Sequence, residues 1–479
     1  MQRRTVAIAG GGLAGLAAGC ALAEAGFRVT LFERRPYLGG RASSYQHPGT
    51  GEVVDNCQHV LLGCCTNLID FYRRTGVEAK IRWYDRLTFL EPGGRASEIA
   101  PSALPAPLHT APSFLRAPCL TLPDKLAIAR AMMALAPAMP PDRGETFLDW
   151  LRRHGQTVQA IERFWKTILV SALNEDLDRV SVPYAAQVVR ESFLKSARAG
   201  RMGIPTVPLT ELYGAAGEYI RARGGEVQLR TSVESFRKND GEILVVANGQ
   251  ERKFDYLVMA VPFDVLGSML PEASSAGPES SSLSQVLDRF ETSPITGIHL
   301  WFDREISELD HAVLLERTIQ WMFHKSRILE ARNKESGSGS YVELVVSCSR
   351  SLVEKSKIEI VEMAARELKE FFPGARDAML VKSTVIKEVH ATFSPGPGVD
   401  ALRPKPETEW PQVFLAGDYT TTGWPATMEG AVRSGYLAAE ALARVAGAED
   451  YKFVAPDLPP TGLMRLFSGT RGKIQQTRT

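Results

Sequence analysis

The sequence has few cysteines, almost no net charge and no long apolar run, and each absence excludes a class of protein. Six cysteines among 479 residues are too few for a disulfide scaffold and favour a reducing cytoplasm. Lysine and arginine number 56 against 55 acidic residues, so the overall charge gives no indication of nucleic acid binding. The apolar stretch 126–139 contains Arg130 and Pro137 and is too short to span a bilayer. The remaining composition is that of a globular protein, and its length predicts two or three domains.

A glycine-rich segment near the N-terminus has the pattern of a dinucleotide-binding site. Residues 6–33 read VAIAGGGLAGLAAGCALAEAGFRVTLFE, which predicts a strand, a turn, a helix and a second strand. Gly10 permits the tight turn, Gly12 lets the backbone approach a pyrophosphate, and Gly15 lets the helix pack closely on the strand. The N-terminus could also be interpreted as a signal peptide, but a signal peptide does not explain the second strand.

The same segment supplies the polar contacts that a dinucleotide needs. The first helical residues, Leu13 and Ala14, place backbone N–H groups at the helix N-terminus, where phosphate binds favourably. Glu33 ends the second strand, eighteen residues after Gly15, where an acceptor for the ribose hydroxyls is required. The fingerprint alone does not choose between NAD and FAD.

The residues after Glu33 favour a flavin. They read RRPYLGGRASSY, so that Arg34 directly follows the ribose acid and the pair Gly39 and Gly40 precedes Arg41. A second glycine pair suits a backbone that passes close to the flavin or its diphosphate, with the arginine as a counter-charge. A surface turn with a solvated arginine is the alternative interpretation.

A third segment lies about 380 residues further on. The sequence VFLAGDYTTTGWPATMEGAVRSGYLAAEALAR predicts a strand, a turn at Gly417 and Asp418, a loop and a long helix. Asp418 suits a hydrogen bond from the ribityl chain of a flavin. Met428, Gly430 and Ala431 lie where that helix begins, and we expect the N–H groups of Gly430 and Ala431 to face an anionic flavin edge.

Together with a mid-chain strand, DYLVMAVP, these three segments resemble the flavin amine oxidase and phytoene desaturase superfamily over the whole chain. The resemblance implies FAD as the cofactor and a mixed α/β fold, in which a discontinuous Rossmann-like FAD-binding domain carries an inserted substrate domain of sheet and helices. It also implies that Val233 holds the adenine through a backbone contact. The FAD-binding domain is predicted to comprise residues 1–75, 205–270 and 408–448. The substrate domain is predicted to comprise 76–204 and 271–407, with a helical part at about 112–200, and a tail follows at 449–479.

The stretch VVDNCQHVLLGCC, which follows GGRASS, contains three cysteines and a histidine. In the superfamily this segment runs along the flavin, so the resemblance places Gln58 and His59 there. A zinc site would require a second ligand pair at metal-binding spacing, and the sequence lacks one, so no metal is predicted. A redox pair is an alternative for Cys64 and Cys65, whereas small buried hydrophobic residues are the simplest interpretation.

The same stretch, together with GIHLWFD and ATFSPGPGVDALRPKPETEWPQVFLAGDYTTTGWPATMEG, resembles the bacterial squalene-associated FAD-dependent desaturases. That group includes hydroxysqualene dehydroxylase of hopanoid biosynthesis. Cys57 stands where the pattern has glycine, and Cys65 where it has an aromatic residue. The resemblance implies that a reduced flavin delivers a hydride to the allylic carbon of hydroxysqualene as water leaves, which gives squalene.

Departure of water requires a proton donor, and the candidates near the flavin are Glu429, His59 and Tyr419. Asp418 is a fourth candidate, although the flavin would occupy it. The physiological reductant is an unidentified electron donor.

Three other functions remain open on sequence grounds. A carotenoid or phytoene-type desaturase would use the same cofactor and an apolar tunnel, with the electrons flowing in the opposite direction. An amine oxidase would need a cage or an acid for a substrate ammonium, and the C-terminal flavin motif has no cysteine to tether the cofactor. A prenyl-binding chaperone without turnover would not need the retained flavin contacts.

A long isoprenoid is almost insoluble in water, so we expect a cytoplasmic protein with peripheral contact to the inner face of the membrane. Residues 458–479 contain four basic and no acidic residues, with an apolar cluster of Leu463, Met464, Leu466 and Phe467. This composition suits anionic lipid. A frayed terminus is the alternative.

Overall fold

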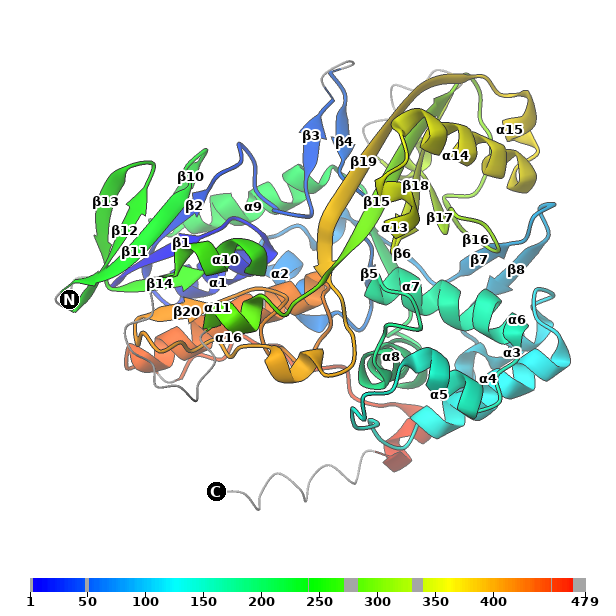
Figure 1. The fold of residues 1–479 in the computed structure, drawn as a ribbon, viewed down its shortest axis with the longest axis horizontal. Helices are drawn as coiled ribbons and strands as arrows, with labels where there is room; N and C mark the ends of the chain where they lie inside the picture. The colour runs from blue at the N-terminus through cyan, green and yellow to red at the C-terminus, as the bar shows by residue number, and fades with distance from the viewer. Residues whose placement is uncertain are drawn as a thin grey trace.

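A computed structural model describes residues 3–47, 51–239, 241–270, 283–329, 339–448 and 450–467. Its first layer is a parallel sheet whose strands come from three distant parts of the chain, in the order β10-β2-β1-β14-β20 (Figure 1). The strands are β1 (Thr5–Ala9), β2 (Arg28–Glu33), β10 (Glu226–Leu229), β14 (Tyr256–Met259) and β20 (Val413–Leu415).

Both faces of this sheet are covered, which explains why its strands are almost entirely apolar. Successive side chains of a strand point to opposite faces, so Val6 and Ile8 pack against helices and Ala7 and Ala9 against a second sheet. The helices are α1 (Leu13–Glu24), α9 (Leu209–Ala222) and α16 (Met428–Val445). The second sheet is antiparallel and consists of β11 (Val233–Asn239), β12 (Glu242–Ala247) and β13 (Gln250–Phe254).

Helices α1 and α16, which come from opposite ends of the chain, pack against each other. A Cβ atom at Gly435 would overlap the carbonyl oxygen of Ala14 and would lie 2.9 Å from the Cβ of Ala17. Only a glycine on α16 therefore allows the two helices this close approach. The alanine-rich sequence of α1 serves the same purpose, because small side chains let it be buried along nearly its whole length.

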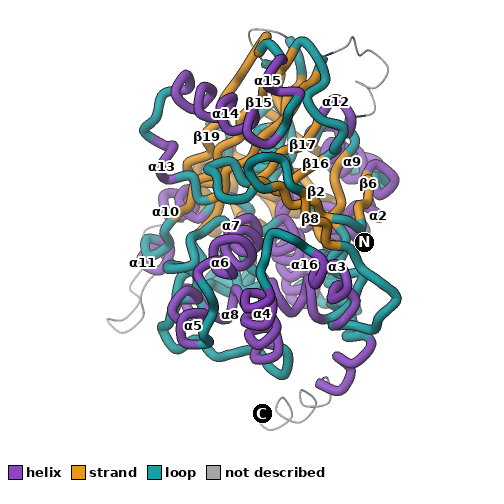
Figure 2. The backbone as a smooth tube through the Cα atoms, turned by 90° about the vertical axis from the view of Figure 1, so that its right-hand side faces the viewer, coloured by secondary structure: helices purple, strands orange, loops and turns teal. Residues whose placement is uncertain are grey.

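The second layer is a seven-stranded sheet in the order β19-β15-β18-β17-β16-β7-β8. Its strands are β7 (Leu87–Leu90), β8 (Ala96–Ile99), β15 (Thr292–Phe302), β16 (His311–Leu314), β17 (Trp321–His324), β18 (Ser340–Ser347) and β19 (Leu380–Phe393). The helices beside it are α12 (Lys325–Ile328), α13 (Arg350–Val353), α14 (Lys357–Phe371) and α15 (Gly374–Asp377). Figure 2 shows this sheet above the helical part of the molecule.

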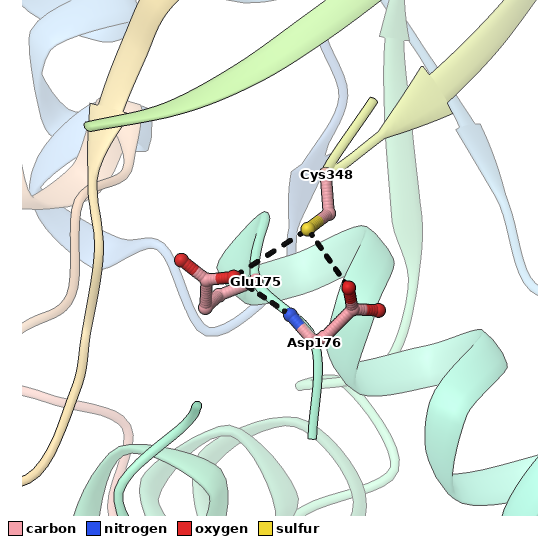
Figure 3. A group of neighbouring side chains, drawn as sticks. All are labelled: Glu175, Asp176 and Cys348. Carbon is pink, nitrogen blue, oxygen red and sulfur yellow. Dashed lines mark hydrogen bonds between the residues drawn. The ribbon is translucent and has the colours of Figure 1, made fainter. Parts of the chain in front are cut away.

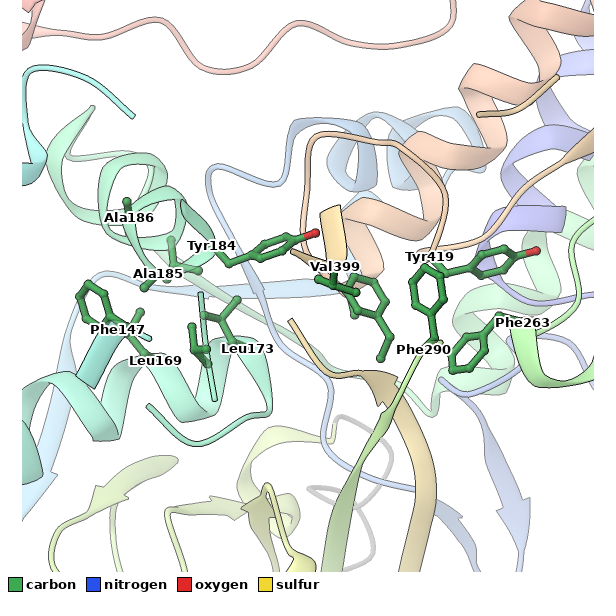
Figure 4. Close-up of a cluster of buried hydrophobic side chains, with 14 of the residues drawn as sticks. Phe147, Leu169, Leu173, Tyr184, Ala185, Ala186, Phe263, Phe290, Val399 and Tyr419 are labelled. Carbon is green, nitrogen blue, oxygen red and sulfur yellow. The ribbon is translucent and has the colours of Figure 1, made fainter. Parts of the chain in front are cut away.

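A helical subdomain occupies the lower right of Figure 1. It comprises α3 (Ala111–Arg116), α4 (Leu122–Leu135), α5 (Phe147–Arg153), α6 (Val158–Ala160), α7 (Thr167–Leu173), α8 (Val182–Val189) and the π-helical segments η3 (Ile161–Lys166) and η4 (Arg190–Leu194). Its core continues into the first layer through an aromatic series, in which Tyr184, Phe393, Phe290, Phe263 and Tyr419 make successive ring contacts (Figure 4).

Short elements connect these parts. They are β3 (Ser44–Gln46), β4 (Val53–Asp55), β5 (Leu61–Leu62), α2 (Thr66–Arg74), η1 (Glu78–Lys80), β6 (Ile81–Tyr84), η2 (Leu108–Thr110), β9 (Met202–Pro205), α10 (Phe263–Met269), α11 (Leu283–Leu287), η6 (Val399–Leu402) and η7 (Gly462–Phe467). The mixed α/β fold predicted from the sequence is confirmed. The domain boundaries stay a prediction.

Candidate active site

The N-terminal glycine turn has the conformation that a bound dinucleotide requires. Gly10 has a φ of +112°, and a Cβ atom there would lie 2.5 Å from the carbonyl oxygen of Ala260. A Cβ at Gly15 would overlap the carbonyl oxygen of Gly10. At Gly12, by contrast, the nearest atom to a Cβ is 3.9 Å away, in Gly40. The turn is therefore tightly packed against the backbone at Gly10 and Gly15, and it leaves open space beside Gly12.

The start of α1 suits a phosphate. The helix has neither a side-chain cap nor an acidic residue in its first turn, so no side chain of the described residues competes with a phosphate at this end. The Glu33 carboxylate is buried, and it accepts the backbone N–H groups of Gly11 and Arg35 at 2.7 Å each. A carboxylate offers more acceptor sites than these two bonds use, which leaves sites for ribose hydroxyls.

Val233 begins β11 and is buried, two residues after Thr231, whose N–H donates to the Glu33 carbonyl at 2.9 Å. This places Val233 near the ribose acid, while its adenine contact stays a prediction. Arg34 is exposed, whereas its neighbour Arg35 donates to the Gly40 carbonyl at 2.9 Å. Arg35 could not be predicted as the contributing residue, because nothing in the sequence distinguishes it from the adjacent Arg34.

Arg41 is not a solvated surface arginine. It donates to Asp418 at 2.7 Å and to the Ala391 carbonyl at 2.8 Å. These bonds link the GGR turn, the C-terminal flavin motif and β19. The alternative of a simple surface turn is therefore wrong for Arg41.

The α16 N-terminus differs from the expectation. The helix begins at Met428, two residues before Gly430. The Gly430 N–H donates to the Thr427 hydroxyl at 3.1 Å, and the Ala431 N–H donates to the Thr427 carbonyl. A side-chain cap and the first helical bond thus use these two N–H groups, and the predicted contact of Gly430 and Ala431 with the flavin stays a prediction. The N–H groups of Met428 and Glu429 remain for a ligand.

Residues 13–443 match the sequence profile described as flavin containing amine oxidoreductase. The chain belongs to this family. Its cofactor is FAD, and the open turn at Gly12, the uncapped α1 N-terminus and the Glu33 carboxylate fit that group.

Named relatives of this flavoprotein are desaturases. It is 29% identical over 464 residues to 15-cis-phytoene desaturase of Synechococcus elongatus, covering 91% of this chain and 95% of that protein. It is 26% identical over 476 residues to the 15-cis-phytoene desaturase of Arabidopsis thaliana, covering 95% and 81%. A solved oxidoreductase from Methanosarcina mazei has the same fold, with a TM-score of 0.69, 19% identity and coverage of 90% and 98%.

A buried lysine, Lys325, holds the segment that contains Gln58 and His59, which is predicted to lie along the flavin. Lys325, 1% exposed, donates to Gln58 Oε1 at 2.7 Å and to Asp55 Oδ2 at 2.8 Å. Its Nζ lies 3.3 Å from Glu343, which is fully buried. Burial raises the pKa of Glu343 to about 7, although Lys325 opposes that shift. Neither residue was predicted from the sequence, in which the one signal is the single acidic residue Glu343 inside the apolar strand SYVELVVS.

His59 has a defined tautomer. Its Nδ1 lies 2.8 Å from the carbonyl oxygen of Cys57, and because a carbonyl only accepts, Nδ1 carries the proton. Nε2 is then the acceptor nitrogen. Burial lowers the pKa of His59, so the ring is neutral at physiological pH.

Glu429 and Tyr419 have different surroundings. The Glu429 carboxylate is fully buried and accepts from the backbone N–H and side chain of Asn67, from the N–H of Leu68 at 2.8 Å and from Arg433 at 3.2 Å. It therefore caps α2. Tyr419 is buried against Phe263, and its hydroxyl has no hydrogen-bond partner among the residues that the structure describes. Gly417 donates its N–H to the Ser434 hydroxyl at 2.8 Å.

All six cysteines are free. Cys57 and Cys64 are buried in hydrophobic clusters, and the Cys64 sulfur lies 3.6 Å from the Ser192 hydroxyl. Cys65 is partly buried beside them. The stretch VVDNCQHVLLGCC thus contributes small packing residues, together with Gln58 and His59 from the segment predicted beside the flavin.

In the part of the chain that the structure describes, one group of side chains has ligand atoms close enough for a metal: Glu175, Asp176 and Cys348 (Figure 3). Arg350 already pairs with both Glu175 oxygens, at 2.5 and 2.7 Å. Burial and the two carboxylates raise the pKa of Cys348 to about 12, so the thiol keeps its proton. The group is better explained as an ion pair that ties α7 to the end of β18.

A cavity of about 310 Å³ lies in the helical subdomain. Segments η2, α3, α4, η3 and η4 surround it, with β7 and residues 197–201. Its wall is mainly apolar and includes Phe89, Phe114, Ile128 and Phe164.

Proposed function

We propose that this flavoprotein is a desaturase of a long isoprenoid. The similarity to phytoene desaturases over nearly the full length of both chains supports the reaction class, and the apolar cavity suits a hydrocarbon chain. FAD, when bound, accepts the hydride from a saturated carbon. The protein must then hold the chain in an apolar channel, exclude water and accept a proton from the neighbouring carbon.

The tautomer of His59 is the observation that most favours desaturation. A neutral imidazole with a free electron pair on Nε2 is a base, so it can accept the proton that leaves with desaturation. It is a poor proton donor for departing water. This is the reverse of the role that the squalene resemblance implies for His59.

His59→Leu should lower desaturation turnover by about 10²–10⁴-fold, the usual contribution of a positioned base, while FAD stays bound. The exposed His390 gives the matched control, His390→Leu, which should leave turnover unchanged. Because the pKa of His59 is lowered from 6.5, wild-type activity should be flat above that pH and fall only below it. Normal turnover in His59→Leu would rule out this base.

The function itself is tested with oxidised holoenzyme under anaerobic conditions. Phytoene-like and squalene-like hydrocarbons are added, the flavin absorbance is followed, and extracted lipid is analysed by mass spectrometry. Flavin bleaching in step with a product two hydrogens lighter supports the proposal. An unchanged spectrum with every hydrocarbon contradicts it.

Reductive dehydroxylation of hydroxysqualene is the second candidate. The resemblance of GIHLWFD and the C-terminal segment to the squalene-associated desaturases favours it. In that reaction reduced FAD would supply the hydride for the allylic carbon, and a proton donor of the protein would let the hydroxide leave as water. Chemically reduced enzyme given hydroxysqualene should then form squalene as its flavin reoxidises.

We also propose that the protein takes its substrate from a membrane surface. No helix in the described ranges is long and apolar enough to cross a bilayer. Large apolar side chains nevertheless stand exposed on α3, α4 and η7, in the lower half of Figures 1 and 2. We call these side chains the apolar rim: Leu115, Leu122, Leu126, Met133, Leu463, Leu466 and Phe467.

The rim joins two parts of the chain. Leu463 donates its N–H to the Ala106 carbonyl at 2.8 Å, which fixes η7 beside the segment that leads into the cavity wall. Leu466 is 79% exposed, and the basic residues Arg116, Lys125 and Arg465 lie on the same elements. Apolar side chains with neighbouring cations suit anionic lipid. The predicted contact through 468–479 lies outside the described residues.

The triple variant Leu122→Glu, Leu126→Glu, Leu466→Glu should bind liposomes of phosphatidylglycerol and phosphatidylcholine at least tenfold more weakly than wild type in a flotation assay. Each change removes an apolar contact and adds a charge that anionic lipid repels. The control is Ile358→Glu on α14, an equally exposed apolar residue away from the rim. Equal binding of all three proteins would contradict the membrane proposal.

A further inference from the structure

Two buried nitrogen atoms of the cavity wall have no hydrogen-bond partner among the described residues: His109 Nδ1 and Arg201 Nε, of which Arg201 still forms an ion pair with Asp85. His109, on η2, lines the cavity and is 2% exposed. Its Nδ1 is buried and has no hydrogen-bond partner in the structure. Leaving a buried polar atom unpaired costs about 1–3 kcal/mol, so a leucine or phenylalanine would be cheaper if the cavity served packing alone.

The other ionic groups of the cavity wall are paired. Arg163 donates to Glu91 at 2.7 Å and to the Cys119 carbonyl at 2.8 Å. Arg201 forms an ion pair with Asp85 at 2.5 Å. Both arginine charges that line the cavity are therefore already paired, and the imidazole is an uncharged polar group that a neutral ligand can use.

The backbone holds His109 in place. Its carbonyl accepts the N–H of Ser102 at 2.7 Å and the Ser102 hydroxyl at 2.8 Å. These two bonds fix the backbone of the short segment η2 at His109. Two π-helical segments, η3 and η4, form other parts of the wall, and such segments are frequent at ligand sites.

Size and chemistry together define the ligand. The volume of about 310 Å³ is twice the roughly 150 Å³ that holds one benzene ring, so the cavity takes about a dozen carbon atoms. That is a stretch of two or three isoprene units. In a neutral imidazole Nδ1 is either a donor or an acceptor, and a hydroxyl group can pair with it in both cases, because a hydroxyl both donates and accepts.

We propose that this cavity binds the hydroxyl-bearing part of an isoprenoid alcohol, with His109 as its hydrogen-bond partner. His109 is a binding residue, and desaturation of a plain hydrocarbon would not need it. The inference rests on the proposed function only for the isoprenoid nature of the ligand. It adds to that function a preference of the cavity for an isoprenoid alcohol over a plain hydrocarbon.

The test compares two C15 probes on the FAD-loaded protein. Farnesol and the hydrocarbon farnesene displace a fluorescent apolar dye from wild type, His109→Phe, His109→Gln and the control His154→Phe, whose ring stacks on Trp150 outside the cavity. The readout is the ratio of farnesol to farnesene affinity. Comparing this ratio between variants cancels the difference in solubility of the probes and any loss of folded protein.

We expect His109→Phe to lower this ratio by about 3–10-fold, the value of one neutral hydrogen bond. His109→Gln should keep most of the ratio, because an amide also donates and accepts, and His154→Phe should keep all of it. A ratio that His109→Phe leaves unchanged overturns the inference.

Two mixed outcomes separate this inference from the proposed function. If neither probe displaces the dye while the enzyme turns over an isoprenoid, the inference is overturned and the proposed function stands. If the ratio depends on His109 but no isoprenoid is turned over, the inference is supported and the proposed function fails.

Discussion

Replacing Lys325 by methionine should destabilise the protein by about 3–5 kcal/mol. Lys325 is the shared cation of Asp55 and Glu343, and all three side chains are buried. Removing one partner of a buried ion pair leaves an uncompensated charge, which accounts for the size of the effect. The variant also loses the bond that orients Gln58, so the segment with His59 should loosen. Urea unfolding of the holoprotein measures the free energy, and near-UV circular dichroism reports on the segment.

Two comparisons test the cause. Lys166→Met removes an exposed helical pair with Glu162 and should change stability by less than about 0.5 kcal/mol. The triple variant Lys325→Met, Asp55→Asn, Glu343→Gln removes all three charges and should recover part of the loss. A Lys325→Met protein as stable as wild type would show that water solvates the cluster and that the ion pair does not stabilise the fold.

The same cluster predicts a dependence of stability on pH. Glu343 has a pKa of about 7 in the folded protein against 4.5 for an ordinary glutamate, so the folded state binds the proton more tightly. Its stabilising contribution is complete below about pH 4.5 and is lost as the pH rises through 7. Glu343→Gln keeps an uncharged side chain at every pH. The urea midpoint of Glu343→Gln minus that of wild type should therefore increase from pH 5 to pH 8.

The sequence allowed prediction of features that depend on local spacing. Gly10, Gly15 and Glu33 lie within one strand-turn-helix-strand unit. Gly10 and Gly15 make the turn and the close approach expected at their positions, while the ribose contact of Glu33 stays a prediction. The cap that Thr427 forms at the start of α16 could not be predicted in this way, because a threonine three residues before a glycine is common in sequences and does not by itself mark a helix start. Its effect on Gly430 is visible only once the helix start is known.

Features that depend on contacts between distant segments escaped prediction. Lys325 and Asp55 are 270 residues apart, and no local pattern pairs them. The role of Glu429 shows the same limit: its position in the flavin motif suggested a proton donor, yet its carboxylate bonds to the first residues of α2. A catalytic role for Glu429 or Tyr419 stays a prediction. His109 lies in an unremarkable loop sequence, and only the cavity makes it a candidate.

Gly435→Ala should destabilise the protein by about 3 kcal/mol and weaken FAD binding. The added Cβ would overlap the carbonyl oxygen of Ala14 in the first turn of α1, and backbone cannot move aside as a side-chain end can. Overpacking of this kind costs about 1–3 kcal/mol, occasionally more. Because the displaced turn carries the N–H groups expected to face the pyrophosphate, the cofactor should be lost at lower denaturant than in wild type.

The matched control is Gly214→Ala in α9, where a Cβ would meet nothing within 4 Å. Alanine favours a helix over glycine by about 0.4–1 kcal/mol, so this variant should be slightly more stable than wild type. Opposite signs for the same substitution in two helices of one layer would isolate the α1–α16 contact as the cause. If both variants bound FAD and unfolded alike, the contact between α1 and α16 would limit neither the stability of the protein nor its affinity for FAD. Flavin fluorescence during urea titration measures cofactor release and unfolding in one experiment.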